Sequence, residues 1–333
     1  MKVAVTGAGG FLGKALVGGL AHSGHQPLAI TKTDETVAQF KNNGINAVRR
    51  DLAMGENCAD IFQDCDALVH CAALTRDFGR WDDFRKINID VTRDIMLSAH
   101  QAGIGRIIHI STTAVYGNER NHYGADEDEI YGQRVVDPYS RSKIFADQYV
   151  LDMIKDRNLP AVVLRFGNIW GPGDQNILLF IADGLKTRRL MIEGGGDNVL
   201  SLTFIENAVA AIILALEDPG AKGKIYNITD GTKVTSKKFI DDIIAILGIK
   251  YKLRNIPYPL LYSMAYFFEQ YYLFTRQTSK PPLTRFAARI LKYHAMFDIS
   301  RAITELGYHP KVSYKEALAI STPYIRSLYF GPK

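Results

Sequence analysis

Four glycines crowd into seven positions near the start of the chain, in the stretch TGAGGFLG at residues 6–13. An apolar run at residues 2–6 precedes them and a helical pattern at residues 11–22 follows, which places the glycines in a tight turn between a strand and a helix. Glycine permits positive φ and lets a ligand approach the backbone closely. The helix that begins there offers free N–H groups and the positive end of its dipole to a phosphate. The stretch therefore predicts a phosphate-binding turn.

The spacing of the glycines decides between three kinds of phosphate-binding turn. A P-loop requires Ser or Thr directly after its Gly-Lys pair, but Ala15 follows Lys14. The dinucleotide motif G-x-G-x-x-G fails by one position, because Leu12 stands where the third glycine is required. The variant T-G-x-x-G-x-x-G fits the sequence at Thr6, Gly7, Gly10 and Gly13. It predicts that this turn binds the pyrophosphate of a dinucleotide.

Short apolar runs alternate with helical patterns along the first half of the chain. The predicted strands are residues 2–6, 26–31, 45–49, 66–70, 105–110 and 161–166, and the predicted helices are residues 11–22, 34–43, 81–102 and 138–157. Apolar runs without strict alternation are typical of parallel strands that are buried on both faces. This order of elements predicts a doubly wound α/β sheet of the Rossmann type.

A length of 333 residues is consistent with one large domain or two closely fused ones. We predict a nucleotide-binding domain over residues 1–170 and a smaller, mostly helical substrate lobe over residues 171–333. One or two further strands from residues 171–230, such as residues 223–229, are expected to join the sheet. Because no Gly/Ser linker separates the two parts, the lobe is expected to pack on the sheet and not to fold alone.

The composition excludes several classes of protein. With 47% hydrophobic and 23% charged residues and a net charge of +5, the chain has the composition of a soluble globular protein. It shows neither a basic stripe nor a nucleic-acid-binding module, so no nucleic-acid partner is expected. The three cysteines lack the spacing of metal ligands, so no metal is predicted. Because no signal peptide precedes the first strand, we expect a cytoplasmic protein.

Residues 256–274, IPYPLLYSMAYFFEQYYLF, are rich in Tyr and Phe and carry a single charge at Glu269. The run is borderline in length for a membrane-spanning helix, and Glu269 and Gln270 interrupt it. We predict a helix of about 15 residues with an aromatic face. Three roles stay open for it: an ordinary packed helix, the wall of a hydrophobic pocket, or peripheral contact with a membrane.

The stretch DPYSRSK places Tyr139 and Lys143 four residues apart on the predicted helix 138–157, so the two side chains share one face. A free phenol has a pKa near 10, and a nearby lysine cation lowers that pKa. Such a tyrosine can exchange a proton with an alcohol or ketone oxygen while hydride moves at the carbon. The stretch HISTTAVYG at residues 109–117 brings further hydroxyl groups to the carboxyl edge of the sheet, where ligands bind in open α/β sheets.

Taken together, these residues resemble the extended short-chain dehydrogenase/reductase superfamily over essentially the whole chain. The resemblance implies that Thr112 is the catalytic hydroxyl, that Tyr139 is the acid/base, and that Lys143 binds the nicotinamide ribose. It also implies that NAD or NADP contacts Gly7, Gly10, Phe11, Leu12, Gly13, Lys32, Asp51, Leu52, Cys71, Ala72, Ala73, Asn88, Tyr139, Lys143 and Phe166. The chain departs from the family's N-x-x-G-T motif, which begins here at Asn88, because Val91 replaces the glycine.

Three comparisons within the superfamily concern the substrate. The Asp-Glu pair of the nucleotide-sugar dehydratases is Thr113-Ala114 here, which argues against elimination of water. The arginine by which nucleotide-sugar epimerases hold a diphosphate is absent, since Leu200-Ser201 stand in its neighbourhood. The pattern over residues 194–211 and the segment 281–310 resemble the 3β-hydroxysteroid and sterol-4-carboxylate dehydrogenase branch.

The resemblance implies an NAD(P)-dependent oxidoreductase that interconverts a secondary alcohol and a ketone on a hydrophobic, sterol-like or 3-hydroxy acid substrate. One alternative is a nucleotide-sugar 4-epimerase, because Asn168 stands where epimerases contact their substrate. Another is a non-catalytic dinucleotide-binding protein, against which the intact Tyr139/Lys143 pair argues. Asn168 and Thr75 are the candidate substrate contacts.

The end of the second predicted strand bears on the choice of cofactor. There a carboxylate would bind the ribose 2′-hydroxyl of NAD, whereas a cation would bind the 2′-phosphate of NADP. Lys32 comes first in this sequence, ahead of Asp34 and Glu35, which favours NADP. Superfamily members are often dimers through two helices, which corresponds here to a homodimer through residues 81–102 and 138–157.

Overall fold

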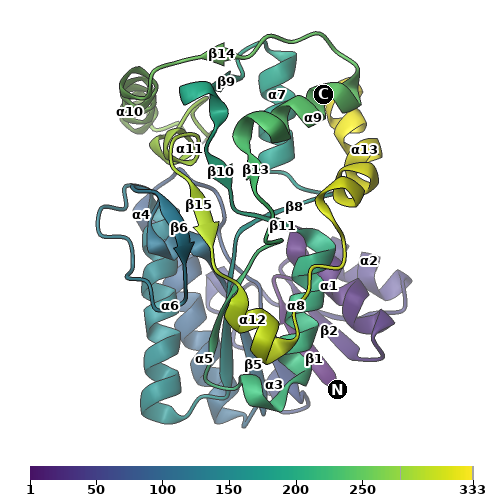
Figure 1. Ribbon diagram of the computed structural model, residues 1–333. Coiled ribbons are helices and arrows are strands. Elements are labelled where there is room, and N and C mark those ends of the chain that lie inside the picture. Colours follow the sequence, from purple (N-terminus) through teal and green to yellow (C-terminus); the bar gives the residue numbers. More distant parts are fainter. Residues whose placement is uncertain (278, 332–333) are drawn as a thin grey trace.

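A seven-stranded parallel sheet forms the centre of the molecule in the computed structural model, which describes residues 1–277 and 279–331 (Figure 1). The strand order is β3-β2-β1-β4-β5-β7-β12. The strands are β1 (Lys2–Thr6), β2 (Gln26–Thr31), β3 (Asn46–Arg49), β4 (Ala67–His70), β5 (Arg106–Thr112), β7 (Ala161–Phe166) and β12 (Ile225–Ile228). The order reverses between β1 and β4, where open α/β sheets form their ligand-binding crevice. The doubly wound sheet predicted from the sequence is confirmed.

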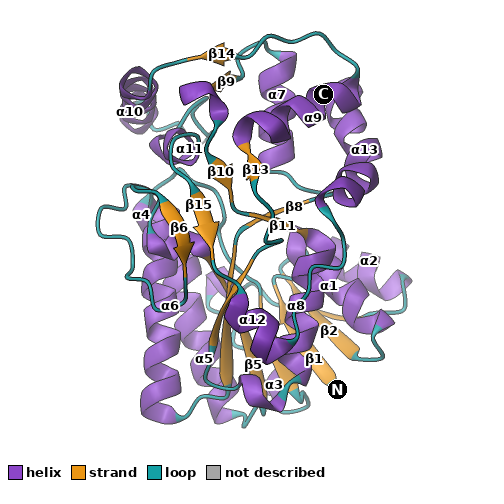
Figure 2. Ribbon diagram, viewed as in Figure 1, coloured by secondary structure: helices purple, strands orange, loops and turns teal. Residues whose placement is uncertain are grey.

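Helices cover both faces of this sheet (Figure 2). Those associated with the sheet are α1 (Phe11–His22), α2 (Asp34–Asn42), α3 (Ala59–Phe62), α4 (Trp81–Phe84), α5 (Val91–Gln101), α6 (Pro138–Arg157) and α8 (Ile205–Glu217). The helix predicted over residues 81–102 has a π-helical stretch at Arg85–Asp90, which joins α4 to α5. Its wider turn accommodates Asn88, a buried polar residue discussed below.

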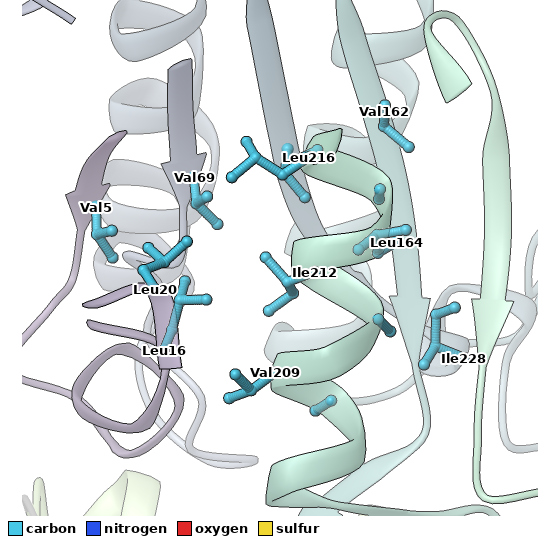
Figure 3. Packing of buried hydrophobic residues seen from close by; sticks show 14 of the residues in the cluster. Val5, Leu16, Leu20, Val69, Val162, Leu164, Val209, Ile212, Leu216 and Ile228 are labelled. Atoms are coloured by element: carbon cyan, nitrogen blue, oxygen red, sulfur yellow. The ribbon is translucent and has the colours of Figure 1, made fainter. Parts of the chain in front are cut away.

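The two faces carry separate hydrophobic clusters. On one face, α1 and α8 pack together and onto the strands, and Figure 3 shows Leu16 and Leu20 of α1 beside Val209, Ile212 and Leu216 of α8. On the other face, α3, α5 and α6 cover the strands through side chains such as Phe62, Met96 and Val150. Since both faces are buried, the strands can be apolar along their whole length, as the sequence shows.

The remainder of the chain forms a lobe beyond the carboxyl edge of the sheet. Its helices are α7 (Ile177–Lys186), α9 (Ser236–Leu247), α10 (Tyr258–Phe274), α11 (Arg285–Ile290) and α13 (Tyr314–Phe330), whereas α12 (Ser300–Leu306) packs against β12 and α8 at the sheet. Short strands pair between them: β6 (His122–Ala125), β8 (Asn168–Trp170), β9 (Met191–Ile192), β10 (Val199–Leu200), β11 (Leu202–Phe204), β13 (Val234–Thr235), β14 (Arg254–Asn255) and β15 (Ala295–Phe297). The lobe has its own core around Trp170, Phe204 and Phe239.

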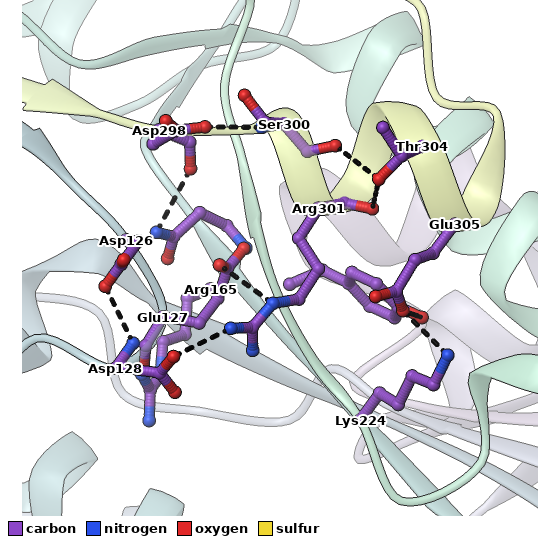
Figure 4. Close-up of polar contacts among 12 residues, drawn as sticks. Asp126, Glu127, Asp128, Arg165, Lys224, Asp298, Ser300, Arg301, Thr304 and Glu305 are labelled. Carbon is purple, nitrogen blue, oxygen red and sulfur yellow. Dashed lines mark hydrogen bonds and ion pairs between the residues drawn. The ribbon is translucent and has the colours of Figure 1, made fainter.

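Ion pairs around α12 bind the last part of the chain to the edge of the sheet (Figure 4). Arg301 of α12 donates to Asp128 at 2.9 Å and approaches Glu127 at 3.4 Å. Lys224, just before β12, pairs with Glu305 of α12 at 2.7 Å. One strand from residues 171–230, β12, joins the central sheet, as the sequence analysis allowed. The domain boundary at residue 170 stays a prediction.

The aromatic segment forms the 17-residue helix α10, slightly longer than the sequence suggested. Pro259 stands at the second position of the helix, where its missing N–H and restricted φ cost nothing. Glu269 is buried and pairs with Arg285 of α11 at 2.6 Å. Within the described residues, no helix combines the length and the apolar content needed to cross a membrane.

Candidate active site

The glycine turn lies at the carboxyl end of β1, directly against the end of β4. Gly7 has φ of +67°, and a Cβ atom there would lie 2.7 Å from the Cα of Ala72. A Cβ atom on Gly13 would lie 2.7 Å from the Cα of Ala8 and would also overlap the Gly7 carbonyl oxygen. Side chains at these two positions would therefore push the turn away from its neighbours.

Gly9, to which the sequence motif assigns no role, has a packing reason in the structure. Its added Cβ would lie 3.2 Å from Thr31 Oγ1, at the end of β2, and 3.2 Å from Thr36 Cγ2 in α2. The turn is thus confined on two sides, by the chain after β4 and by the chain after β2.

The start of α1 has the features of an anion site. Gly10 is the residue that precedes the helix, and no side chain caps the N–H groups of the first turn, where Phe11 and Leu12 lie. Free N–H groups and the helix dipole favour a negatively charged ligand at this point. The residues present therefore fit the pyrophosphate of a dinucleotide.

The other predicted cofactor contacts lie along the same edge of the sheet. Asp51 precedes a short 3₁₀ helix (Leu52–Met54) and accepts a hydrogen bond from the Ala53 N–H at 3.1 Å. Cys71 follows β4 and donates its backbone N–H to the Thr6 carbonyl at 3.2 Å. Burial raises the pKa of the Cys71 thiol to about 12, so this thiol is unreactive. Lys32 is exposed at the end of β2.

Asn88 organises the loop after β4. Its amide accepts from the Leu74 N–H at 2.7 Å and donates to the Leu74 carbonyl at 3.0 Å. The same amide nitrogen donates to Ser142 Oγ of α6 at 2.8 Å. Asn88 thereby ties the loop that carries Ala72, Ala73 and Thr75 to the helix that carries the tyrosine and the lysine. Val91, the departure from the family motif, is buried in the α5 side of the core.

The structure brings Thr112, Tyr139 and Lys143 together at the carboxyl edge of β5. Thr112 is the last residue of β5, Tyr139 is the second residue of α6, and Lys143 lies one turn further along α6. Lys143 is buried and donates from Nζ to the Ile110 carbonyl at 2.6 Å. Burial lowers the pKa of Lys143 to about 8.

The protonation of Tyr139 depends mainly on burial. Burial raises the pKa of Tyr139 to about 12, and a hydrogen bond with the Thr112 side chain acts in the opposite direction. The ammonium group of Lys143 is directed to the Ile110 carbonyl, and the tuning of the Tyr139 pKa by Lys143 stays a prediction. Tyr139 is therefore a neutral phenol at neutral pH, able to donate a proton.

Local sequence explains why α6 begins where it does. Asp137 caps the helix by accepting from the Ser140 N–H at 2.7 Å, and Pro138 occupies the first helical position. Burial raises the pKa of Asp137 to about 6. This start places Tyr139 in the first turn of the helix, next to the end of β5.

Two buried charged residues behind the site are ones that our sequence reasoning missed. Arg165 of β7 donates to Asp147 of α6 at 2.6 Å, with side-chain exposures of 3% and 0%. Arg165 also donates to the Tyr116 hydroxyl at 2.8 Å and to the Glu127 carbonyl at 3.0 Å. Since Asp147 lies one turn after Lys143, this network holds the catalytic face of α6 against the sheet. A charged residue inside the apolar strand AVVLRF was the available signal.

His70 is a second buried polar residue beneath the site. Its ring bonds Thr6 Oγ1 at 2.8 Å through Nδ1 and Thr92 Oγ1 at 3.0 Å through Nε2. Burial, and to a smaller extent the charge of Lys143, lowers the pKa of His70 to about 3. The imidazole is thus neutral at physiological pH and connects β1, β4 and α5.

A cavity lies between the sheet edge and the C-terminal lobe, and Thr112 and Asn168 both line it. Its other walls combine apolar and aromatic side chains (Leu200, Phe286, Ile290, Tyr293 and Phe297) with polar and charged ones (Thr113, Asn118, Arg120, His122, Ser201, Arg289 and His294). The structure thus places Asn168 in the same cavity as Thr112. It does not do so for Thr75, which is exposed in the loop after β4 and is absent from the cavity wall. Phe166 is buried at the end of β7, opposite Thr112 in the strand register.

Two further expectations from the sequence concern metal ions and self-association. Among residues 1–277 and 279–331, no three His, Cys, Asp or Glu side chains gather so that they could hold a metal ion. The homodimer through residues 81–102 and 138–157 stays a prediction, as does the cytoplasmic location.

Comparison with known proteins agrees with this site. Residues 3–229 match the model of the NAD dependent epimerase/dehydratase family. The chain is 33% identical to a 2-alkyl-3-oxoalkanoate reductase of Stenotrophomonas maltophilia, over 96% of this chain and 97% of that protein. It is 25% identical to a 3-beta-hydroxysteroid dehydrogenase of Mycolicibacterium neoaurum, over 98% and 92% of the two chains. A solved UDP-glucuronic acid 4-epimerase from Bacillus cereus in complex with NAD superposes with a TM-score of 0.77 at 23% identity, covering 99% of this chain and 100% of the epimerase, which shows the fold alone.

Proposed function

The chain belongs to the NAD dependent epimerase/dehydratase family, and from this premise we propose that it interconverts a secondary alcohol and a ketone on a hydrophobic substrate. The substrate classes that we propose are 3-oxo or 3-hydroxy acids and sterol-like alcohols. The observation that carries the proposal is the grouping of the half-buried Thr112 and Tyr139 with the buried Lys143 at the carboxyl edge of the sheet.

We propose that the dinucleotide lies across the crevice between β1 and β4. The glycine turn, Phe11 and Leu12 would hold the pyrophosphate, Asp51 and Leu52 would flank the adenine, and Lys143 would bind the nicotinamide ribose. Cys71, Ala72, Ala73, Asn88 and Phe166 would line the remainder of the crevice. The position of Lys32 at the end of β2, ahead of Asp34 and Glu35, supports NADP over NAD.

When bound, the nicotinamide supplies or accepts the hydride, and the residues of this chain manage the proton. Tyr139 is protonated at neutral pH, so it can donate its proton to the substrate oxygen as that oxygen becomes an alkoxide. Thr112 would donate a hydrogen bond to the same oxygen and stabilise its developing charge.

The lining of the cavity supports a hydrophobic substrate. Aromatic and aliphatic side chains from β10, α11 and β15 line the same cavity as Thr112, together with polar groups such as Arg120 and Arg289 that could bind a carboxylate. Relatives of this chain include a reductase named for 2-alkyl-3-oxoalkanoates and a dehydrogenase named for 3β-hydroxysteroids. Both names describe an oxygen-bearing carbon within a large apolar molecule, which matches the chemistry of the cavity.

A nucleotide-sugar 4-epimerase is the second candidate, and Asn168 is the observation that favours it. Its side chain lines the same cavity as Thr112, where an amide could bind a sugar hydroxyl. Leu200 lines this cavity too, in the neighbourhood where a diphosphate-binding arginine would be expected. Interconversion of UDP-sugars by purified protein that retains NAD would support this candidate.

The decisive experiment compares Tyr139→Phe with the wild type in the reduction of a 2-alkyl-3-oxo acid, followed by the absorbance of the reduced nicotinamide. We expect kcat to fall by roughly 10²–10⁴-fold, because the proton donor is lost. The affinity for NADPH, measured by fluorescence titration, should change little.

Tyr123→Phe provides the matched control, because Tyr123 is exposed on β6 and has no proposed role in the reaction. It should retain wild-type kcat. Full activity of Tyr139→Phe would contradict the proposed mechanism. If the wild type reduces neither this acid nor a 3-oxosteroid, the proposed substrate classes are wrong.

A further inference from the structure

Helix α10 presents an unusual amount of apolar surface to solvent. Leu260, Phe267 and Phe274 are 55%, 70% and 88% exposed, and Tyr266, Tyr271 and Leu273 are exposed as well. Leu260, Phe267 and Phe274 are spaced seven residues apart, which places them along one line of the helix surface. An exposed, contiguous apolar face of this kind marks an interaction site.

The inward side of α10 is correspondingly narrow. Leu261, Ala265 and Glu269 are its buried residues, spaced four apart, and they pack against α11 and the segment before it. The helix is therefore anchored along one stripe, by a small apolar cluster and by the Glu269–Arg285 ion pair. Figure 1 shows α10 at the outer edge of the lobe, where the opposite side of the helix is free to meet a partner.

The charges that flank α10 indicate which kind of partner fits. Residues 248–280 contain five basic residues (Lys250, Lys252, Arg254, Arg276 and Lys280) and one acid, the buried Glu269. Each of these five basic residues is exposed, and Lys280 forms an ion pair with Asp77 at 2.8 Å. Arg254 lies in β14, which pairs with β9, and Arg188 and Arg189 directly precede β9. The aromatic face is thus bordered by exposed positive charge.

We propose that α10 is a membrane-docking helix, which lies in the interface of an anionic bilayer with Phe267, Tyr271 and Phe274 among the lipid headgroups. Tyr and Phe side chains suit this boundary because their rings are apolar and the tyrosine hydroxyl stays hydrated. The basic residues at both ends of the helix would contact the lipid phosphates. The proposal concerns where the protein binds and is independent of the reaction that it catalyses.

A cavity beneath α10 connects this surface to the catalytic helix. It has a volume of about 230 Å³ and is lined by Glu269 and Leu273 of α10 and by Asp137, Pro138 and Arg141 around the start of α6, with Asp77 and Arg285 adding further charge to the wall. Pro138 directly precedes Tyr139. If the proposed function holds, docking of α10 would therefore hold the start of the catalytic helix near the bilayer, and this additional step rests on that function.

The test is flotation of the full chain with phosphatidylcholine vesicles, with and without added phosphatidylglycerol. We expect wild-type protein to bind the anionic vesicles, and the double variant Phe267→Ser/Phe274→Ser to bind with an about tenfold lower partition coefficient, because two exposed aromatic side chains are lost. The matched control is Met54→Ser/Ile130→Ser, which removes two exposed apolar side chains outside α10 and should bind as the wild type does.

A second variant, Lys252→Gln/Arg254→Gln, separates the two contributions. It should weaken binding to the anionic vesicles, and salt at about 1 M should do the same, because the Debye length then falls to about 3 Å. Wild-type protein that ignores both kinds of vesicle would overturn the proposal, and so would equal binding by the α10 variant. If wild type ignores vesicles and is a dimer that the α10 variant dissociates, the surface belongs to a second copy of the chain.

An activity measurement distinguishes this proposal from the proposed function. The α10 variant should lose activity on a long-chain 3-oxo acid held in vesicles and retain activity on a short-chain, water-soluble one. Absence of both activities in wild-type protein that still binds vesicles would contradict the proposed function and leave membrane docking standing.

Discussion

Helices α6 and α10 depart from the usual distribution of side chains in opposite directions. Helix α6 buries charge, since Lys143 and Asp147 are both enclosed between the helix and the sheet. Helix α10 exposes apolar rings, since Phe267 and Phe274 project from the lobe. Burying a charge without a partner costs free energy, and so does exposing apolar surface to water.

The two helices differ in whether their unusual side chains find interaction partners within the chain. The buried charges of α6 have partners within the chain: Arg165 for Asp147, and the Ile110 carbonyl for Lys143. Among the outward rings of α10, Tyr266 lies against the Arg285 guanidinium of α11, 5.4 Å from the ring centroid, whereas Phe267 and Phe274 stay largely exposed. The comparison teaches that α6 is completed by its own fold, whereas α10 leaves an apolar face exposed, to which we assign a partner outside the chain.

The largest effect on stability is expected for a substitution that removes the counter-charge of a buried residue on α6. Arg165→Met should lower the free energy of unfolding by about 3–5 kcal/mol, because it leaves the Asp147 carboxylate buried without a counter-charge. Urea denaturation measures this change. The double variant Arg165→Met/Asp147→Leu should recover part of the loss, since the uncompensated charge is then absent. A loss below about 1 kcal/mol for the single variant would mean that the pair does not hold α6 in place.

The pH dependence of stability tests the buried polar layer beneath α6. The pKa of His70 is about 3 in the folded protein, against about 6.5 for a free imidazole. Between these values the unfolded chain binds more protons, so the contribution of His70 is complete above pH 6.5 and is lost as the pH falls towards 3. At pH 5 this loss should reach about 2 kcal/mol.

His70→Gln should remove this part of the acid sensitivity, because glutamine does not titrate. Chemical denaturation at several pH values between 6.5 and 4 compares the slopes of the wild type and the variant. His100→Gln, on the exposed face of α5, is the control and should retain the wild-type slope. Identical slopes for His70→Gln and the wild type would contradict the assigned burial of a neutral imidazole.

The smallest effect on stability is expected for a substitution on the exposed face of α10. Phe267→Ser should change the free energy of unfolding by no more than about 0.5 kcal/mol, because the ring makes little contact with the rest of the chain. Val150→Ala, which removes a fully buried side chain of α6, should cost about 1–3 kcal/mol. Thermal unfolding measures both variants. A large loss for Phe267→Ser would show that α10 is an ordinary packed helix.

Local sequence predicted much of the fold. The glycine turn and the alternation of apolar runs with helical patterns identified the doubly wound sheet, and the predicted bounds of helices α1 and α6 are those observed. These features are local, since each depends on spacing within about 20 residues. The resemblance to the short-chain dehydrogenase/reductase superfamily is confirmed at the level of the family. The individual roles of the site residues stay predictions.

Other features depended on contacts between distant segments. The hydrogen bond between Arg165 and Tyr116 joins residues 49 positions apart, and the hydrogen bond between Asn88 and Ser142 spans 54. A side chain at position 9 would be crowded by the end of β2, which lies beside Gly9 only in the folded chain. No periodicity in the sequence reports such contacts, because they follow from how helices and strands pack.

By itself the sequence determined the element order, the glycine turn between β1 and α1 and the pairing of Tyr139 with Lys143 on one helix face, because these properties follow from spacing along the chain. Only the tertiary structure decided the protonation of that pair. The pKa values of Tyr139 and Lys143 depend mainly on burial, and burial is a property of the packed sheet, helix and lobe together. The tertiary structure also decided which aromatic rings of α10 reach solvent, since that depends on which stripe of the helix its neighbours cover.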